Sequence, residues 1–336
     1  MKKTILILLG TSLYFLFSSA GYASEKRSLW EIDDLLTEVE KPYVMGHRGY
    51  GENLDPNAAI PIENTIKSVV RAFEEGVAIV EVDVTVTADG KAVLLHDDYL
   101  SDYTCVNTLT YDQLKERLPY VPKLSHVLHV AKKFARKSEH VSGLVNIEVK
   151  SAAPFCDVND SSELALASSV IKAVKNTKMQ NQVVIESFSP ALLALFATEA
   201  ADLKRNLTLN ILQLLAPEVV EAATGLPVTL IDKQAGYGLQ WAEIGSLFRL
   251  PGYRSLDEYI GVAYQLGAKF LTMDKLVFFQ AEHSQHGSAS YLVNQAHQLG
   301  FEVLPYTVDT VEEWQLLKSF GADGIITNNI PMALNQ

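Results

Sequence analysis

Short apolar runs alternate with amphipathic stretches from Tyr43 to Ile330, and this alternation restricts the possible folds more than any other feature of the chain. Repeated strand-then-helix patterns are typical of a parallel α/β sheet. The predicted strands are Tyr43–Gly46, Ile79–Thr85, Ala92–His96, Val145–Val149, Val183–Ser187, Leu207–Leu212, Lys269–Thr272, Val303–Thr307 and Gly324–Thr327. The predicted helices are Glu63–Glu74, Leu124–Arg136, Ser162–Asn176, Pro190–Ala200, Ala289–Leu299 and Val311–Phe320.

The nine predicted strands are one too many for an eightfold barrel, and the short link after the second strand explains the surplus. Only Thr87-Ala88-Asp89-Gly90 separates the second run from the third, which is a hairpin-turn sequence. A parallel crossover would need about a dozen residues or more. We therefore expect Ala92–His96 to return antiparallel as an arm, and the other strands to form a TIM-type (β/α)8 barrel.

The chain of 336 residues has 48% hydrophobic and 20% charged residues, which suits one large folded domain. Met1–Ala23 has two lysines, then an apolar run, then small residues, which is the pattern of a cleavable secretory signal peptide. An uncleaved membrane anchor is the alternative. We therefore expect a single barrel domain over residues 24–336 that is periplasmic or secreted and has no stable membrane insertion after cleavage.

Net charge and cysteine content narrow the possible partners. Loss of Lys2 and Lys3 with the signal peptide changes the formal net charge from −12 to −14, which argues against nucleic acid as a partner. A locally bound divalent metal still permits a phosphate substrate. Cys105 and Cys156 are the only cysteines, and the sequence leaves both a disulfide and two separate thiols open. The oligomeric state also stays open.

Two segments are longer than a plain barrel requires, namely Asp98–Lys123 and Ala216–Gly267. Active sites of such barrels lie at the carboxyl ends of the strands, so both segments are expected over or beside the mouth. Their aromatic residues suggest covers that face the substrate, although packed surface insertions are an equal alternative. These aromatic residues include Tyr99, Tyr103, Tyr237, Trp241, Phe248, Tyr253 and Tyr259.

Three carboxylates in apolar strand sequences form a candidate metal site. Glu81 and Asp83 lie two residues apart on one strand and therefore share a face, and Glu148 has the same phase on another strand. Buried like charges need a metal or paired cations, and oxygen donors suit calcium or magnesium better than zinc. Salt bridges to lysine or arginine within the barrel are the alternative.

Two histidines at predicted strand ends are candidate acid and base groups. His47 is followed by Arg48 and Gly49, and a planar guanidinium suits two phosphate oxygens at once. His96 is followed by Asp97, which could orient the ring. No Gly-x-Ser-x-Gly elbow, Walker loop or Gly-x-Gly-x-x-Gly fingerprint supports a serine hydrolase, nucleotidase or dehydrogenase.

The ordered motifs resemble those of the glycerophosphodiester phosphodiesterase family, in its exported bacterial type. They are Gly46-His47-Arg48-Gly49, Ile62-Glu63-Asn64-Thr65, Glu81-Val82-Asp83-Val84, Thr87-Ala88-Asp89-Gly90, His96-Asp97, Glu148-Val149-Lys150, Ser187-Phe188 and Gly321-Ala322-Asp323-Gly324-Ile325-Ile326-Thr327. Each motif is weak alone, but together they span most of the chain. The resemblance implies a TIM barrel and hydrolysis of a small-molecule glycerophosphodiester to sn-glycerol 3-phosphate and an alcohol.

The resemblance also implies a role for each motif. Glu81, Asp83 and Glu148 would hold one divalent cation, with calcium favoured over magnesium. His47 and His96 would be the acid and base, and Arg48 and Lys150 would bind the phosphate. Further contacts are expected from Glu63, Asp97, Phe188 and Tyr306. The chain departs from the family pattern at Tyr306, Glu186 and Asn328, where tryptophan, a neutral residue and aspartate are usual.

Two other functions remain open on the sequence. A barrel phosphodiesterase of the sphingomyelinase D or phosphatidylinositol phospholipase C type would act on intact phospholipids and would need an exposed apolar rim. An exported surface protein without enzymatic activity would be expected to have lost a histidine or a carboxylate. This chain retains all of them.

Overall fold

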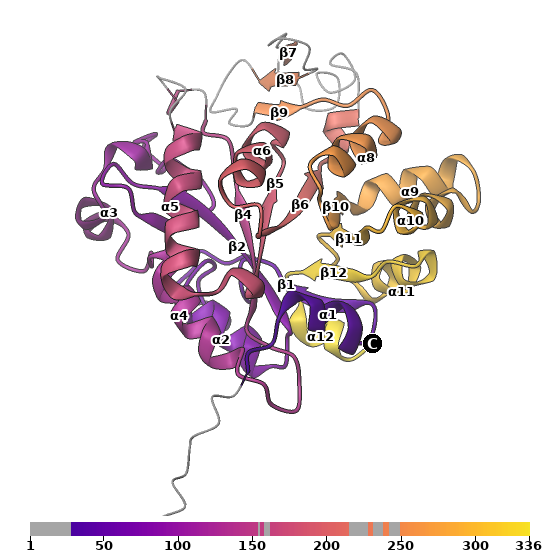
Figure 1. The fold of residues 1–336 in the computed structure, drawn as a ribbon, viewed down its shortest axis with the longest axis horizontal. Coiled ribbons are helices and arrows are strands. Elements are labelled where there is room, and N and C mark those ends of the chain that lie inside the picture. Colours follow the sequence, from indigo (N-terminus) through magenta and orange to yellow (C-terminus); the bar gives the residue numbers. More distant parts are fainter. Residues whose placement is uncertain (1–27, 154, 158–161, 215–227, 231–237, 242–248) are drawn as a thin grey trace, which may run out of the picture.

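Parallel strands form the wall of a nearly closed barrel in the computed structural model, which describes residues 28–153, 155–157, 162–214, 228–230, 238–241 and 249–336 (Figure 1). Hydrogen-bonded neighbours follow the order β11-β10-β6-β5-β4-β2-β1-β12. The strands are β1 Tyr43–Gly46, β2 Ile79–Val86, β4 Leu144–Val149, β5 Val183–Ser187, β6 Lys204–Leu209, β10 Phe270–Asp274, β11 Glu302–Tyr306 and β12 Gly324–Thr327. The predicted TIM-type barrel is confirmed.

The seam between β11 and β12 lacks a continuous ladder but is bridged at both ends. The amide of Asp323 donates to the carbonyl of Val303 at 3.0 Å. The amide of Val308 donates to the carbonyl of Ile326 at 2.9 Å. These two bonds bring the first and last strands of the order together.

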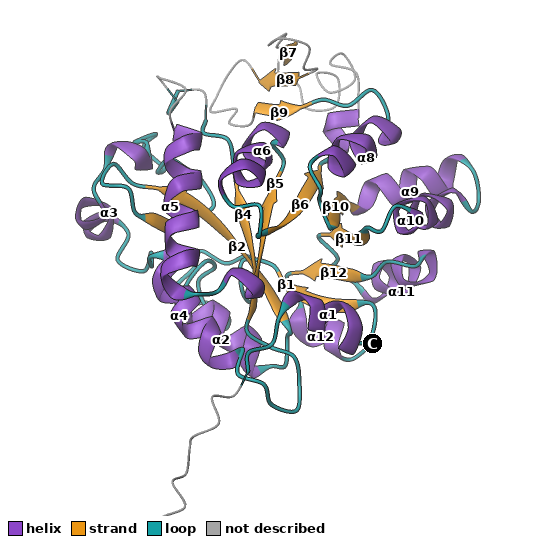
Figure 2. Ribbon diagram, in the orientation of Figure 1, coloured by secondary structure: helices purple, strands orange, loops and turns teal. Residues whose placement is uncertain are grey.

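Helices surround the strands on the outside of the barrel (Figure 2). They are α1 Ile32–Glu38, α2 Ile66–Glu74, α3 Tyr111–Arg117, α4 Leu124–Phe134, α5 Ser162–Thr177, α6 Pro190–Glu199, α8 Leu256–Gln265, α9 Lys275–Ser284, α10 Ser288–Gln298, α11 Val311–Phe320 and α12 Ile330–Leu334. Side-chain N-caps start α2 at Thr65, α6 at Ser189, α8 at Ser255 and α11 at Thr310. The sequence pattern located α11 correctly, but it missed α1, α3, α8, α9 and α12.

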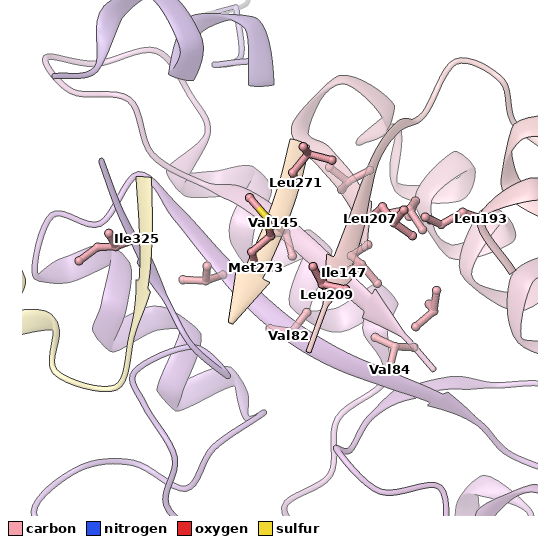
Figure 3. Close-up of a cluster of buried hydrophobic side chains, with 14 of the residues drawn as sticks. Val82, Val84, Val145, Ile147, Leu193, Leu207, Leu209, Leu271, Met273 and Ile325 are labelled. Atoms are coloured by element: carbon pink, nitrogen blue, oxygen red, sulfur yellow. The ribbon is translucent and has the colours of Figure 1, made fainter. Parts of the chain in front are cut away.

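The main hydrophobic core lies between the outward faces of the strands and these helices (Figure 3). Alternate residues of one strand, such as Val82 and Val84, point outward into it. The residues between them, Glu81 and Asp83, consequently point into the barrel. The apolar packing of the strands therefore fixes the direction of the carboxylates.

The predicted returning arm is confirmed. Strand β3, Ala92–Leu94, pairs antiparallel with β2 in the register Val84↔Leu94 and Val86↔Ala92. The segment after it has a small core of its own, which includes Leu100, Val106 and Leu114. A disulfide between Cys105 and Cys156 ties this segment to the loop after β4. The cysteine question that the sequence left open is thereby answered.

The second long segment contains a short antiparallel sheet that the sequence pattern did not predict. Its strands are β7 Val228–Leu230, β8 Gly238–Trp241 and β9 Arg249–Pro251. Tyr253 and Tyr259 are buried with ring centroids 5.3 Å apart, so their expected position facing the substrate was wrong. They were misassigned because tyrosine also packs well in a core. Tyr237, Phe248 and the side chain of Trp241 lie outside the described residues.

Residues 1–23, expected to form the signal peptide, also lie outside the described part of the chain. Within that part, none of the helices combines the length and apolar character needed to cross a bilayer.

Candidate active site

Three carboxylates converge at one end of the barrel. Asp83 on β2 is the register partner of Glu148 on β4, and Glu81 lies two residues before Asp83 on the same face. One oxygen from each of the three lies within 4.8 Å of the others. Strand β2 continues past Asp83 to Val86, because its last residues pair with β3. The structure thus brings together the three carboxylates that the sequence pattern placed on one face.

The three carboxylates differ in the positively charged side chains that lie beside them. Lys150 forms ion pairs with Asp83 and, at 2.9 Å, with Glu148. Burial alone would raise the pKa of Asp83, but Lys150, His96 and Arg48 bring it below its usual range. Burial, followed by repulsion from Asp83 and Glu148, raises the pKa of Glu81 well above its usual range. Glu81 Oε2 accepts from the amide of Arg48 at 2.7 Å, but within the described part of the chain no lysine or arginine side chain forms an ion pair with Glu81.

A divalent cation would fit this donor set. Glu81 Oε1 is buried and has no hydrogen-bond partner among the described residues, so its position leaves an oxygen available as a ligand. Three oxygen donors on two rigid strands are a ligand set suited to calcium or magnesium. The ammonium group of Lys150 forms ion pairs with both Asp83 and Glu148, so the salt bridges of the alternative prediction are present. They are compatible with the predicted metal site.

An asparagine fixes the side chain of Asp83 and the peptide that precedes it. Asn64 Nδ2 donates to Asp83 Oδ2 at 2.8 Å, and the Asp83 amide donates to Asn64 Oδ1 at 3.0 Å. Asn64 has a φ of 53°, in the left-handed region that asparagine tolerates better than most residues. This role was not predicted, although the Ile62-Glu63-Asn64-Thr65 motif marked the position.

Arg48 is held in place by acidic neighbours. Its Nη1 donates to Glu63 Oε1 at 2.9 Å, its Nη2 lies 3.2 Å from Glu52 Oε1, and its Nε lies 3.5 Å from Asp83 Oδ2. Glu63 also accepts from the amide of Asn53 at 3.1 Å. The predicted supporting position of Glu63 thus places the guanidinium beside the carboxylates.

His47 follows β1 directly, and its two ring nitrogens face different groups. Nδ1 lies 2.8 Å from Asn328 Oδ1, whose amide group donates through Nδ2 to Asp309 Oδ2 at 3.1 Å. This network makes the Nδ1 of His47 the donor, so the neutral ring carries its lone pair on Nε2. Nε2 lies 4.0 Å from Glu81 Oε2. Burial, and then the charge of Arg48, lowers the pKa of His47.

His96 lies two residues beyond the end of β3, at the same mouth as His47. Its Nδ1 is 2.8 Å from Asp97 Oδ1, as the order His96-Asp97 suggested. Burial would raise the pKa of Asp97, but the hydrogen bond and charge of His96 lower it. The contact with Asp97 fixes the orientation of the His96 ring.

These groups line one pocket of about 220 Å³ together with less polar residues on the opposite strands. Phe188 and Tyr306 lie edge to face in it, with ring centroids 6.3 Å apart. Thr208 and Asn210 lie at its far wall. The pocket thus brings together both histidines, Glu81, Glu148, Arg48 and Lys150.

Glu186 adds a further carboxyl group to the pocket. It is the register partner of Glu148 on β5, so Asp83, Glu148 and Glu186 form a row across three strands. Glu186 accepts hydrogen bonds from Thr208 Oγ1 at 2.7 Å and from Asn146 Nδ2. Burial, and then the charge of Glu148, raises its pKa to about 8. Sequence comparison with the family pattern marked this position only as a departure.

Comparison with known proteins agrees with this geometry. Residues 47–240 and 253–332 match the glycerophosphoryl diester phosphodiesterase family. The chain belongs to this family. The predicted family membership and the prediction of an enzyme of this family are therefore confirmed.

Individual relatives are similar along most of their length. A glycerophosphodiester phosphodiesterase of Caldanaerobacter subterraneus is 24% identical over 310 residues, covering 88% of this chain and 97% of the relative. The solved glycerophosphodiester phosphodiesterase of Parabacteroides distasonis has a TM-score of 0.59 at 20% identity, covering 87% of this chain and 95% of the other. An Oleispira antarctica phosphodiesterase, solved with the product sn-glycerol-3-phosphate, has a TM-score of 0.57 at 18% identity, covering 88% and 97%.

Proposed function

We propose that this protein hydrolyses glycerophosphodiesters to sn-glycerol 3-phosphate and an alcohol, with one divalent cation and a histidine acid–base pair. The observation that carries this proposal is one pocket lined by two histidines, two cations and the carboxylates Glu81 and Glu148. The Asp83 carboxylate lies within 4.8 Å of those two carboxylates. The bound product of the Oleispira antarctica protein supports the substrate class.

Glu81, Asp83 and Glu148 would hold the cation, and three protein carboxylates favour calcium over magnesium, which usually keeps several waters. When bound, the cation would offset negative charge on the phosphate as the reaction proceeds. Arg48 and Lys150 would bind the phosphate oxygens beside it. Both cations already lie between carboxylates, so their positions are fixed before the substrate binds.

The two histidines differ in their partners, and this difference supports separate roles for them. His47 Nε2 carries a free lone pair because Nδ1 donates to Asn328, so His47 would take the proton of the attacking oxygen. Asp97 contacts Nδ1 of His96 and orients the ring, and His96 would donate a proton to the leaving alkoxide. The attacking oxygen belongs to water or to the adjacent glycerol hydroxyl. In the second route the alcohol leaves as a cyclic phosphate forms, and water then opens that ring to give the same products.

Removal of either histidine should abolish most activity without unfolding the barrel, because both rings lie at the mouth and outside the hydrophobic core. We expect His47→Ala and His96→Ala each to lower kcat by roughly 10²–10⁴-fold. Release of sn-glycerol 3-phosphate from glycerophosphocholine, measured beside circular dichroism, provides the test. His140→Ala, at an exposed histidine before β4, is the matched control. Near-normal turnover in both active-site variants would refute the proposed roles.

Export through the predicted signal peptide is part of the proposal. The disulfide between Cys105 and Cys156 supports it, because such bonds persist in oxidising compartments. Cell fractionation should find the mature protein, starting at Ser24, in the periplasm or the medium. A full-length protein in the cytoplasm would contradict the assignment.

A further inference from the structure

Three aromatic rings lie together beside the active-site mouth and take no part in the chemistry described above. Tyr99 and Tyr103 are nearly parallel, with centroids 6.1 Å apart and planes 8° apart. Phe155 stands edge-on to both, at 5.3 Å and 62° from Tyr99 and at 6.2 Å and 70° from Tyr103. We refer to Tyr99, Tyr103 and Phe155 as the aromatic corner.

Burial in the folded protein does not account for the backbone strain and the exposed rings of the aromatic corner. Tyr103 has a φ of 62°, a backbone conformation in which glycine would be unstrained, and yet 55% of the residue is exposed. Phe155 is 41% exposed. Exposed rings on a strained turn recover little free energy by burial, so they are better explained by a ligand.

The two halves of the corner come from different segments, and several contacts join them. Cys105, two residues after Tyr103, is disulfide-bonded to Cys156, which follows Phe155. Asp98 Oδ2 accepts from the amide of Ala153 at 2.9 Å across the same junction. The corner is therefore a preorganised surface.

The corner adjoins the catalytic groups on the side of His96. Tyr99 shares a small pocket with His96, Asp97, Asp98 and Lys150, and both His96 and Lys150 also line the main pocket. Burial, together with the charges of Asp97 and Asp98, raises the pKa of Tyr99 to about 12. Tyr99 thus has the carboxylates of Asp97 and Asp98 beside it, while the ammonium group of Lys150 is paired with Asp83 and Glu148.

We infer that the aromatic corner binds the cationic headgroup of the leaving alcohol, with a quaternary ammonium such as choline as the preferred class. Ring faces attract such cations, and neighbouring carboxylates add a favourable charge. This inference rests on the proposed function, because His96 protonates the leaving oxygen and the headgroup therefore extends past His96 toward Tyr99. The corner would make glycerophosphocholine a better substrate than an uncharged diester of the same shape.

The test compares two diesters that differ in one atom. They are glycerophosphocholine and its neutral isostere, in which carbon replaces the quaternary nitrogen. For each variant, the measured quantity is the ratio of kcat/KM for the choline diester to kcat/KM for the isostere. Tyr103→Gly removes a ring and relieves the strained φ, so this variant should fold at least as well as the wild type.

We expect Tyr103→Gly and Phe155→Leu each to lower this ratio about threefold, and the double variant to lower it about tenfold. Tyr103→Phe keeps the ring and should change the ratio less than about twofold. Tyr291→Ala, at a tyrosine 66% exposed on α10, is the matched control and should leave the ratio unchanged. An unchanged ratio in the double variant would overturn the inference.

Two further measurements separate this inference from the proposed function and from a lipid-binding role. Saturation-transfer NMR of choline methyl protons reports binding without turnover, and its signal should fall in the double variant. If the wild type hydrolyses neither diester but binds choline at the corner, the proposed function fails and the binding site stands. If the double variant instead loses only binding to phosphatidylcholine vesicles, the corner contacts a lipid surface and the headgroup inference is wrong.

Discussion

Asp83, Glu148 and Glu186 occupy one row across three strands, but their surroundings give them different charges. Asp83 has Lys150 and Arg48 as counter-ions, and these hold its pKa below the usual range. Glu186 is buried beside Glu148 and accepts hydrogen bonds from the neutral groups of Thr208 and Asn146, and its pKa rises to about 8. A protonated carboxyl group at Glu186 limits repulsion within the row.

Glu186→Gln should therefore stabilise the metal-free protein at alkaline pH. The pKa of Glu186 is higher in the folded chain, at about 8, than its ordinary value of 4.5, so its contribution to stability is greatest below pH 4.5 and is lost as the pH rises toward 8. Glutamine cannot ionise and can replace the protonated acid between Thr208 and Asn146. Its advantage should appear at about pH 9 and vanish near pH 5.

Urea unfolding in EDTA at the two pH values measures this difference directly. Glu199→Gln, at an exposed glutamate that ends α6, is the control. Equal gains for Glu186→Gln at both pH values would show that Glu186 is not held protonated.

At the scale of elements, the arm and the β4–α5 loop together shape the side of the mouth that carries His96. The arm returns along β2, and the disulfide spans 51 positions of sequence to join the two segments. Closing such a long loop restricts the unfolded chain considerably. The disulfide thus contributes to stability and also positions the aromatic corner.

Replacing both cysteines, as Cys105→Ser with Cys156→Ser, should lower the free energy of unfolding by about 2–4 kcal/mol. The same double variant should lower the preference for glycerophosphocholine over its neutral isostere, because the two halves of the corner lose their covalent link. Urea unfolding and the two-substrate ratio test the two effects. A stability equal to that of the wild type would show that the unfolded chain is not constrained by this bond.

The elements also show which features the sequence could predict. The two-residue period of Ile79–Val84 predicted that Glu81 and Asp83 share a face, and the short Thr87–Gly90 turn predicted the arm, since both signals are local. The contact between His47 and Asn328 spans 281 positions and depends on barrel closure, so no local pattern could reveal it. The β7–β9 sheet was missed because its strands are short and carry no clear alternation.

At the scale of the whole molecule, apolar packing and the charged pocket occupy opposite ends of the barrel interior. Apolar residues such as Tyr43, Phe270 and Leu304 fill one end, while the charged pocket lies at the carboxyl ends of the strands. The chain has a net charge of −12, yet Arg48 and Lys150 are held at the mouth by buried carboxylates. An acidic protein can thereby bind a negatively charged diester.

The central claim is that a cation held by Glu81, Asp83 and Glu148 enables the histidine pair to cleave a glycerophosphodiester. The most direct test is the release of sn-glycerol 3-phosphate from glycerophosphocholine by protein stripped of metal and then titrated with calcium. We predict that the stripped protein is inactive, that calcium restores turnover saturably, and that Glu81→Gln prevents this recovery. Full turnover after complete metal removal would contradict the account.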